Sequence, residues 1–548
     1  MTDHSVLDEA FDEETDIIVV GTGAGGLSAA AVAAADGARV IVLEKASTIG
    51  GTTRKSAAAL WIPNNRFIRE AGQEDRLEDV MRFLARLSRP TLYDAASPTF
   101  GLPAWEFEML EVFCTTASEA QDELERLGAM TLAPSPYDIP DYQGHRAENS
   151  LPRGRTLYEA NSLGAANGGQ ELVDHLAAGA RAHGADIRVS HEVIEVILAG
   201  DGTVIGALVQ HDGKTLRMRA SAGVIFASGG FTHNADYRLQ YLNGPFMGGC
   251  AVETNTGDFL RIASGLGAEL ANLSEAWTVA INTERMQREP DTFMSSFYVL
   301  GDSLIEVNRA GHRVVNEKTP YNEHGRVMSA WDPVELRYPN MPLIAVWDQQ
   351  VADRWGIDRF GNPVPTTDAD PYWVVSGSSL SELTAAIDQK LVHLGGLVGH
   401  ARLDADFEKN LAASIERFGR FADQGFDEDF RRGDTEFERY VSARFGDGDG
   451  ENPLMRRLDL SGTLYASVLA LGTLDTKGGP RTTPRREVLR MDGSVIHGLF
   501  AVGNCAASAG GQGYPGAGAT LGPIVTEGYL AARQAVGRLK TLASRGAA

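Results

Sequence analysis

The chain has 548 residues, with 50 basic and 73 acidic side chains and a formal charge of −23. Hydrophobic residues make up 43% and charged residues 22% of the sequence, which is typical of a globular protein and excludes wholesale disorder. The length indicates about three to four domain-sized units, or fewer large ones. The acidic balance, without a Lys- or Arg-rich run, argues against a nucleic-acid partner.

Other sequence features exclude a membrane span and indicate the compartment. The apolar runs are well short of the ~20 residues that a bilayer requires, so we expect no transmembrane segment. The first 14 residues contain six carboxylates and no Lys or Arg, which is the opposite of a targeting peptide. The three cysteines are far apart, so neither a disulfide framework nor a metal site is expected. We therefore expect a cytoplasmic protein.

The N-terminal part predicts a strand, a helix and a second strand within about thirty residues. Residues 16–20 form an apolar run bounded by glycine, as in a strand buried on both faces. A Gly-rich segment and an Ala-rich stretch to Ala35 predict a helix, which Gly37 ends. Residues 38–43 predict a second buried strand, followed by Glu44. This order is the start of a Rossmann-like α/β domain.

The same style of sequence resumes in the middle of the chain and at its C-terminal end. A helix is predicted over 172–183, and a final helix follows the Gly-rich stretch 503–522. Further strands are predicted at 187–189, 193–198, 204–210, 224–227 and 498–502. The second and third of these strands flank a Gly-Asp-Gly turn at 200–202, so we expect them to pair antiparallel.

Between about residues 280 and 455 aromatic and charged residues are mixed, and 402–446 predicts helices with an acidic, solvated face. We interpret this region as an inserted α+β domain. The predicted organisation is a first part of a cofactor domain over 1–280, an inserted domain over 281–455, and the rest of the cofactor domain over 456–548.

The first strand leads into a dinucleotide-binding pattern. Gly21 permits a tight turn, Gly23 lets backbone N–H groups approach a pyrophosphate at a helix N-terminus, and Gly26 allows close packing of helix and strand. Glu44, at the end of the next strand, is placed to accept hydrogen bonds from the adenosine ribose and disfavours NADP. The hydroxyl- and glycine-rich segment 47–56 could line a second side of the diphosphate, which favours FAD over NAD.

With these residues the chain resembles the flavoprotein family of fumarate reductase and succinate dehydrogenase subunits, and within it the 3-ketosteroid Δ1-dehydrogenase branch. The motifs that carry the resemblance are 21–26 with Glu44, 50–53 with 61–63, 227–231, 256–258, 315–317 with 320–321, 425–430 with Gly433, 503–504 and 514–523. The last motif is specific to the ketosteroid branch. The implied fold is a Rossmann-like FAD domain split by an inserted catalytic, substrate-capping domain.

The resemblance also implies a set of FAD-binding residues. They are Gly21, Gly23, Ala24, Gly25, Gly26, Glu44, Lys45, Gly50, Gly51, Thr52, Thr53, Ser56, Val193, Ser228, Gly229, Asp258, Gly503, Asn504, Ala519, Thr520 and Leu521. Ala57, Ala58 and Phe259 replace residues that are usually glycine in the family, and Phe259 could reshape the packing near the flavin. None of the 12 histidines lies between residues 5 and 144, so the FAD should be bound without a covalent link.

The family's chemistry suggests a role for each of four residues. Desaturation beside a ketone needs a base for the α-proton, donors to the developing enolate and a hydride acceptor, which the flavin provides. Tyr321 matches the base, and Tyr514 with the backbone N–H of Gly518 matches the pair that holds the carbonyl oxygen. A further tyrosine that supports the base is expected at Tyr142, with Tyr137 as the alternative.

Three functions remain open. The first is desaturation of a 3-oxosteroid or a smaller, cyclohexanone-type ketone, with an external electron acceptor. Met294 and Phe297 are candidate walls of an apolar pocket, and core packing explains them equally well. The second is reduction of an activated alkene, as in fumarate reductases, in which Arg309, Arg313 and His324 would clamp a dicarboxylate. The third is a flavin-carrying binding or redox-sensing protein. If His324 does not bind a dicarboxylate, we expect it to face solvent. The sequence does not indicate the oligomeric state.

Overall fold

The computed structural model describes residues 10–162, 168–290, 301–354, 372–445 and 451–546. The chain folds into two compact units. Unit 1 comprises Met1–Asn234, Val252–Glu275 and Thr476–Ala548, and unit 2 comprises Ala235–Ala251 and Ala276–Asp475. Each unit has its own sheet and its own hydrophobic core.

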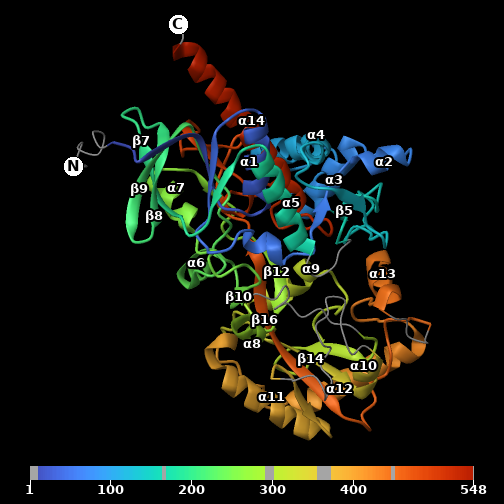
Figure 1. Ribbon diagram of the computed structural model, residues 1–548. Helices are drawn as coiled ribbons and strands as arrows, with labels where there is room; N and C mark the ends of the chain where they lie inside the picture. The colour runs from blue at the N-terminus through green and yellow to red at the C-terminus, as the bar shows by residue number, and fades with distance from the viewer. Residues whose placement is uncertain (1–9, 163–167, 291–300, 355–371, 446–450, 547–548) are drawn as a thin grey trace. The chain divides into compact units, whose positions relative to one another are not determined.

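Unit 1 is built on an eight-stranded sheet (Figure 1). The main strands lie in the order β18 (Glu487–Leu489), β19 (Val495–Ala501), β9 (Lys214–Phe226), β1 (Glu13–Val20), β2 (Val40–Leu43) and β6 (Asp186–Arg188). The neighbours from β19 to β6 are parallel, and β18 is antiparallel to β19. Helices α5 (Gly168–Ala182) and α14 (Leu521–Gly546) pack on α1 (Ala24–Ala35), which connects β1 to β2.

The predicted strand–helix–strand start is confirmed. The last four residues of β1 and all four of β2 are buried aliphatic side chains, as expected for central strands covered on both faces. Helix α1 ends at Ala35, and Gly37 follows with a φ of +91°, which glycine adopts without strain. The antiparallel pairing of β7 (Glu192–Leu198) with β8 (Val204–His211) is also confirmed, and β8 continues the meander by pairing with β9.

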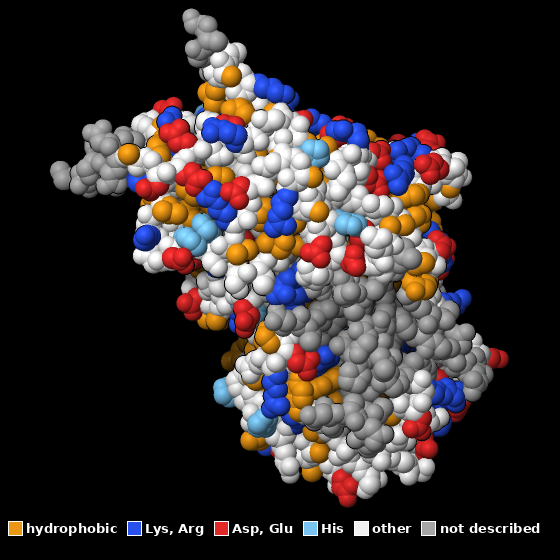
Figure 2. All heavy atoms as spheres, in the orientation of Figure 1, with side chains coloured by type: hydrophobic (Ala, Val, Ile, Leu, Met, Phe, Trp, Pro, Cys, Tyr) orange, Lys and Arg blue, Asp and Glu red, His pale blue; other side chains and the backbone are white. Residues whose placement is uncertain are grey.

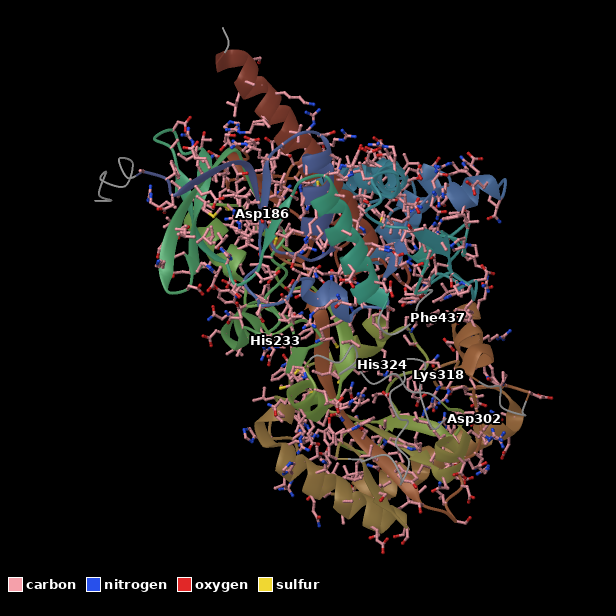
Figure 3. All side chains as sticks on the ribbon, viewed as in Figure 1. Asp186, His233, Asp302, Lys318, His324 and Phe437 are labelled. Atoms are coloured by element: carbon pink, nitrogen blue, oxygen red, sulfur yellow. The ribbon has the colours of Figure 1, made fainter. Side chains whose placement is uncertain are left out.

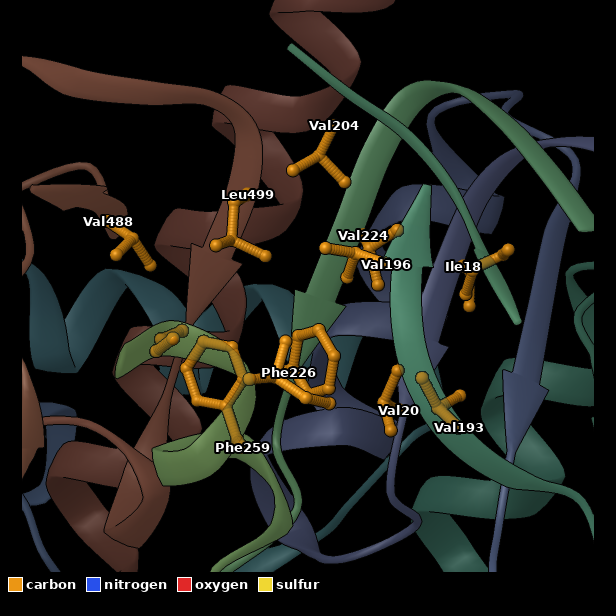
Figure 4. Packing of buried hydrophobic residues seen from close by; sticks show 14 of the residues in the cluster. Ile18, Val20, Val193, Val196, Val204, Val224, Phe226, Phe259, Val488 and Leu499 are labelled. Atoms are coloured by element: carbon orange, nitrogen blue, oxygen red, sulfur yellow. The ribbon is translucent and has the colours of Figure 1, made fainter. Parts of the chain in front are cut away.

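A hydrophobic core lies against the main sheet of unit 1 (Figure 4). Ile18, Val20 and Val224 contribute from the central parallel strands. Phe259, in α7 (Asp258–Gly265), is 1% exposed and stacks on Phe226, with ring centroids 4.1 Å apart. The residue that departs from the usual glycine of the family therefore serves as core packing.

A smaller antiparallel sheet completes the part of unit 1 that carries the candidate site. It has the order β3 (Ala59–Trp61), β5 (Thr156–Glu159) and β4 (Leu132–Pro134). Helices α2 (Arg66–Glu70), α3 (Leu77–Ser88) and α4 (Ala104–Arg126) lie between β3 and β4 in the chain. The short pair β11 (Leu270–Ala271) and β17 (Gly479–Pro480) joins two further segments of the unit.

Unit 2 has a six-stranded sheet around the long strand β16 (Leu464–Thr476). The other strands are β10 (Gly248–Gly249), β12 (Ala276–Ile281), β13 (Leu304–Val307), β14 (Leu343–Asp348) and β15 (Val375–Gly377). Because side chains alternate along a strand, Leu343, Ala345 and Trp347 belong to one core, whereas Ile344 and Val346 belong to a second. The second core also contains residues of α11 (Leu380–Leu394) and α12 (Phe407–Gln424).

The remaining helices of unit 2 are shorter. They are α6 (Ala235–Tyr241), α8 (Thr283–Arg288), α9 (Tyr321–Arg326), α10 (Gln349–Arg354) and α13 (Glu436–Phe445). Helices α12 and α13 confirm the predicted helical character of 402–446. None of the described helices has the length and apolar character that a membrane crossing needs. Figure 2 shows acidic and basic side chains interspersed over the drawn face of unit 1.

Candidate active site

The N-terminus of α1 has the shape that a diphosphate requires. Gly21 has a φ of +103°, and a methyl group on Gly26 would lie 2.0 Å from the Gly21 carbonyl oxygen, so both positions require glycine. The N–H groups of Gly25 and Gly26 are buried and donate to no residue in the described part of the chain. Unpaired amides at a helix N-terminus bind anions, so this site fits a cofactor diphosphate.

Hydrogen bonds join the predicted ribose carboxylate to the Gly-rich segments. Glu44 is 7% exposed, and its Oε2 accepts from the N–H and Oγ1 of Thr22 at 3.1 and 2.5 Å. Thr22 Oγ1 in turn accepts from the Gly50 N–H at 2.9 Å, and Thr53 Oγ1 accepts from the Ala24 N–H at 2.9 Å. These contacts bring the predicted segments 21–26, 44 and 50–53 together, and they show that Thr22 helps to hold them.

The C-terminal part of unit 1 approaches the same helix. A methyl group on Gly25 would lie 2.9 Å from a side-chain carbon of Ile524 in α14 and 3.2 Å from one of Val502. Gly503 follows Val502 with a φ of +68°, and its N–H donates to Glu527 Oε2 at 2.6 Å. The predicted cofactor residues at 503–504 directly follow Val502, and those at 519–521 shortly precede Ile524. Both groups are therefore next in the chain to residues that pack near Gly25.

Other predicted cofactor residues use their side chains within the protein. Lys45 Nζ forms an ion pair with Asp258 Oδ2 at 2.6 Å, so these two bind each other. The Val193 side chain packs in the core of the sheet (Figure 4). Gly229, after β9, has a φ of +73°, and a methyl group there would lie 2.6 Å from the Asn255 amide. At these positions Val193 and Gly229 can offer only backbone atoms to a cofactor.

Two more of the predicted hydroxyls accept hydrogen bonds from backbone N–H groups of unit 1. Thr52 Oγ1 accepts from the N–H of Val252 at 3.2 Å. Ser56 Oγ accepts from the N–H of Ala58 at 3.1 Å. Ala58, where the family usually has glycine, has a φ of +52°, in the left-handed region that glycine adopts more easily.

Two of the predicted catalytic tyrosines lie against each other in unit 1. The rings of Tyr142 and Tyr514 stack with their centroids 5.6 Å apart and their planes at 14°. The N–H of Tyr142 donates to the carbonyl oxygen of Pro515 at 2.9 Å. Tyr142 is 6% and Tyr514 3% exposed, whereas the alternative candidate, Tyr137, is 47% exposed. The structure therefore pairs Tyr142, and not the exposed Tyr137, with Tyr514.

The segment after Tyr514 presents a buried donor. Gly518 has a φ of +90°, and its carbonyl oxygen accepts from the N–H of Trp61 at 3.0 Å. The Gly518 N–H is buried and has no acceptor among the residues that the structure describes. The Tyr514 hydroxyl lies 3.4 Å from Thr520 Oγ1. A phenol and an unpaired amide on one short segment can both donate to a single ligand oxygen.

Tyr321, the predicted base, is the first residue of α9 in unit 2 and is half-buried. The segment that carries it is fixed from both sides. Asn322 Oδ1 accepts from the N–H of Thr278 at 3.1 Å, which attaches α9 to β12. His324 Nε2 lies 2.6 Å from Glu306 Oε2, which attaches the same helix to β13.

The expectation that His324 faces solvent is wrong. His324 is 6% exposed and Glu306 is fully buried (His324 is labelled in Figure 3). Burial disfavours the imidazolium, but the charge of Glu306 and the hydrogen bond to it outweigh burial and raise the pKa of His324. An apolar strand that carries one glutamate needs a partner for that carboxylate, and His324 is that partner.

A buried ion network holds the chain just before Tyr321. Arg313 bridges Glu317 and Asp427 at 2.9 and 3.0 Å, and Arg432 also binds Glu317, at 3.2 Å. Burial favours the neutral form of Glu317, but the two arginines lower its pKa to about 2. Lys318, the next residue (labelled in Figure 3), is also buried, and burial together with the charge of Arg432 lowers its pKa well below the ordinary value.

These contacts bear on the dicarboxylate clamp that the reductase alternative needs. Arg313 is engaged by Glu317 and Asp427, Arg309 forms an ion pair with Asp404 at 3.4 Å, and His324 binds Glu306. All three candidate clamp residues therefore have a carboxylate partner within unit 2. The predicted pocket walls Met294 and Phe297 lie outside the described residues. No cluster of metal-ligating side chains occurs in the described ranges.

The fold and the glycine-rich helix start define an FAD-dependent oxidoreductase. The sequence matches the FAD binding domain family over residues 16–521, and the chain belongs to that family. Its cofactor is FAD. The start of α1 fits that cofactor's diphosphate, because its buried amides have no acceptor in the described part of the chain and its glycines leave no room for a methyl group.

Curated relatives match nearly the whole chain. The 4-oxocyclohexanecarboxylate 2-dehydrogenase of Sinomonas cyclohexanicum is 33% identical over 95% of this chain and 93% of the relative. The 3-oxosteroid 1-dehydrogenase of Mycobacterium tuberculosis is 31% identical over 95% of this chain and 98% of the relative.

Among solved structures, the 3-ketosteroid Δ1-dehydrogenase of Sterolibacterium denitrificans, in complex with 1,4-androstadiene-3,17-dione, matches with a TM-score of 0.78. The match covers 96% of this chain and all of that one, at 24% identity. A flavocytochrome c3 fumarate reductase matches with a TM-score of 0.65 over 96% of this chain and 79% of the other, at 20% identity. These likenesses establish the fold.

Proposed function

We propose that the protein introduces a double bond between the α- and β-carbons of a cyclic ketone. The substrate is a 3-oxosteroid or a smaller cyclohexanone-type ketone. The observation that carries the proposal is the buried Tyr142–Tyr514 stack together with the N–H of Gly518, which follows Tyr514 on the same short segment and has no acceptor among the described residues. Relatives named for a steroid ketone and for a monocyclic ketone support the shared chemistry. Their similar identities, 31% and 33%, leave both ring sizes as substrates to test.

In the proposed reaction the chain's residues handle the proton and the oxygen. When bound, FAD would accept the hydride that leaves the β-carbon of the substrate. The Tyr514 hydroxyl and the Gly518 N–H donate to the ketone oxygen, which makes the α-proton more acidic and stabilises the enolate as it forms. Tyr321, as phenolate, removes the α-proton. Because the ordinary tyrosine pKa is about 10, we assign to Tyr142 the role of supporting that phenolate.

We assign the cofactor to unit 1 and a catalytic, substrate-capping role to unit 2, inserted between the segments of unit 1. The N-terminus of α14 contributes positive electrostatic potential, which favours negative charge on the bound flavin. This chain would hold FAD without a covalent link, and an external acceptor would take up the electrons.

The reductase alternative has less support. It needs free cationic side chains for a dicarboxylate, but Arg309, Arg313 and His324 are each bound to a carboxylate in unit 2. It also gives no role to the Tyr142–Tyr514 stack. A flavin carrier without catalysis likewise gives no role to the buried phenols.

The test is anaerobic titration of the purified yellow protein. We expect 4-androstene-3,17-dione, 4-oxocyclohexanecarboxylate, or both to bleach the flavin absorbance, and fumarate to leave the reduced protein unchanged. Bleaching only by dithionite, followed by reoxidation with fumarate, would support the reductase instead. A flavin that responds to neither class of compound would favour the carrier.

A further inference from the structure

Unit 1 contains a fully buried arginine, Arg155, that binds two carboxylates. One of them, Asp141, directly precedes Tyr142 in the chain. Arg155 donates from Nε and Nη2 to Asp75 at 2.8 and 2.6 Å and from Nη1 to Asp141 Oδ2 at 2.6 Å. Arg155 Nη1 also donates to Asn149 Oδ1, and Asn149 Nδ2 donates to Asp141 Oδ2. Arg155 and Asp75 have no exposed side-chain surface, and Asp141 has 2%. Such a buried network is costly to form and is weak evidence for stability alone.

Asp141 is the member of this network that reaches the catalytic segments. Its Oδ1 accepts from Trp61 Nε1 at 2.7 Å, and the backbone N–H of Trp61 donates to the carbonyl oxygen of Gly518 at 3.0 Å. A methyl group on Gly516 would lie 3.0 Å from the same carboxylate oxygen. One face of the Asp141 carboxylate is therefore packed against the segment that carries Gly518.

The chain position of Asp141 links the carboxylate to the phenols as well. The next residue, Tyr142, donates its N–H to Pro515 and stacks its ring on Tyr514. The Asp141 N–H is itself fixed by the carbonyl oxygen of Pro152 at 2.7 Å. A shift of this carboxylate would therefore move Tyr142 directly and the 514–518 segment through Trp61.

From these contacts we infer that Asp141, held by Arg155, is a positioning residue that sets the stacking of Tyr142 on Tyr514 and the direction of the Gly518 N–H. The inference rests on the proposed function, in which that phenol and that N–H hold the ketone oxygen. The Asp75 carboxylate accepts hydrogen bonds from the same arginine and from the N–H of Asn64, whereas the Trp61 N–H donates to Asp141. Asp75 is therefore the matched control that separates positioning from support of the fold.

The test compares Asp141→Asn with Asp75→Asn. The asparagine amide would turn a donor toward Arg155 or Trp61 and break one of the two contacts. We expect Asp141→Asn to retain FAD and lower kcat about 10- to 100-fold with KM changed less than about threefold, because a misplaced donor acts mainly on the transition state. Asp75→Asn should lower the melting temperature by about as much as Asp141→Asn does, but it should change kcat less than about threefold.

A second measurement does not depend on turnover. Nitration by tetranitromethane, mapped by mass spectrometry, should modify the exposed Tyr137 equally in wild type and in Asp141→Asn. Tyr142 and Tyr514 should be more reactive in Asp141→Asn than in wild type. Trp61→Phe, which removes only the N–H donor and part of the ring, should raise their reactivity in the same way. This variant also serves if Asp141→Asn does not fold.

The outcomes separate the two claims. If wild-type flavin is bleached by no cyclic ketone, the proposed function fails, and the nitration pattern still tests the positioning of the stack. If wild type turns over while Asp141→Asn keeps kcat within threefold, or Asp75→Asn loses as much kcat as Asp141→Asn, the inference is overturned. Unchanged nitration of Tyr142 and Tyr514 in both Asp141→Asn and Trp61→Phe would also overturn it.

Discussion

Tyr142 and Tyr514, from distant parts of the chain, stack with 5.6 Å between their ring centroids, and both are buried. Buried phenols usually find a polar partner for their hydroxyl, and Gly518, on the same short segment as Tyr514, is buried as well. The pairing identifies the part of unit 1 in which a carbonyl oxygen could be held, and it distinguishes two tyrosines that lie only five positions apart in the sequence.

The first prediction concerns those two tyrosines. Tyr142→Phe should retain FAD and lower kcat with a cyclic ketone by about 10²-fold, because a hydroxyl that supports the base is lost. Tyr137→Phe, at an exposed position, should leave kcat within about twofold. Steady-state assays with an artificial electron acceptor measure both. Equal effects of the two substitutions would refute the assignment of Tyr142.

The second prediction concerns the glycine at the start of α1. Gly26→Ala should destabilise the protein by about 1–3 kcal/mol and weaken FAD binding, because its methyl group would lie 2.0 Å from the Gly21 carbonyl oxygen. Gly265→Ala, in α7, places a methyl group where no atom lies within 4 Å. This control should be neutral or slightly stabilising, as alanine favours helices. Thermal unfolding and FAD titration would show the contrast, and similar losses in both variants would contradict the close-packing argument.

The third prediction is the pH dependence of the His324–Glu306 pair. The pKa of His324 is raised in the folded protein above its unfolded value of about 6.5, so the pair stabilises fully below that value. Its contribution is lost as the pH rises through the folded pKa. In urea unfolding, His324→Gln should therefore cost more free energy at about pH 6 than at about pH 9, with a loss of about 3 kcal/mol at the lower pH.

The exposed His393, with 67% of its side chain accessible, provides the control for this experiment. His393→Gln should change the free energy of unfolding by less than about 0.5 kcal/mol at either pH. A cost of His324→Gln that is independent of pH, or larger at high pH, would show that the imidazolium is not what stabilises the pair.

The fourth prediction concerns the attachment of the cofactor. No histidine lies between residues 5 and 144, where the family's covalent link is expected. Precipitation with trichloroacetic acid should therefore release all of the flavin into the supernatant. Yellow colour that remains in the washed pellet would contradict non-covalent binding.

Much of unit 1 could be predicted from the sequence because its signals are local. The aliphatic run of β1, the glycines at Gly21 and Gly26 and the acid at Glu44 lie within one strand–helix–strand segment, where a short spacing determines the geometry. The hairpin of β7 and β8 could be predicted for the same reason, since its strands flank a three-residue Gly-Asp-Gly turn at 200–202.

The long-range contacts could not be predicted. The burial of His324, in helix α9, depends on Glu306, a carboxylate in strand β13, and no periodicity relates the two. The network of Asp75, Asp141 and Arg155 joins three separate segments of unit 1. The role of Arg155 depends on the positions of both carboxylates. The choice between Tyr142 and Tyr137 likewise depended on tertiary burial.

The central claim is that Tyr321 and Tyr514 act on the same ketone. The most direct measurement is anaerobic stopped-flow reduction of the flavin by a ketone that bleaches the wild type, in Tyr321→Phe, Tyr514→Phe and the double variant. Each single variant should retain FAD and reduce it about 10²- to 10⁴-fold more slowly, and the double variant should be little slower than the slower single one, because residues that act as a unit are non-additive. Wild-type reduction rates in either single variant, or fully additive losses in the double variant, would contradict the account.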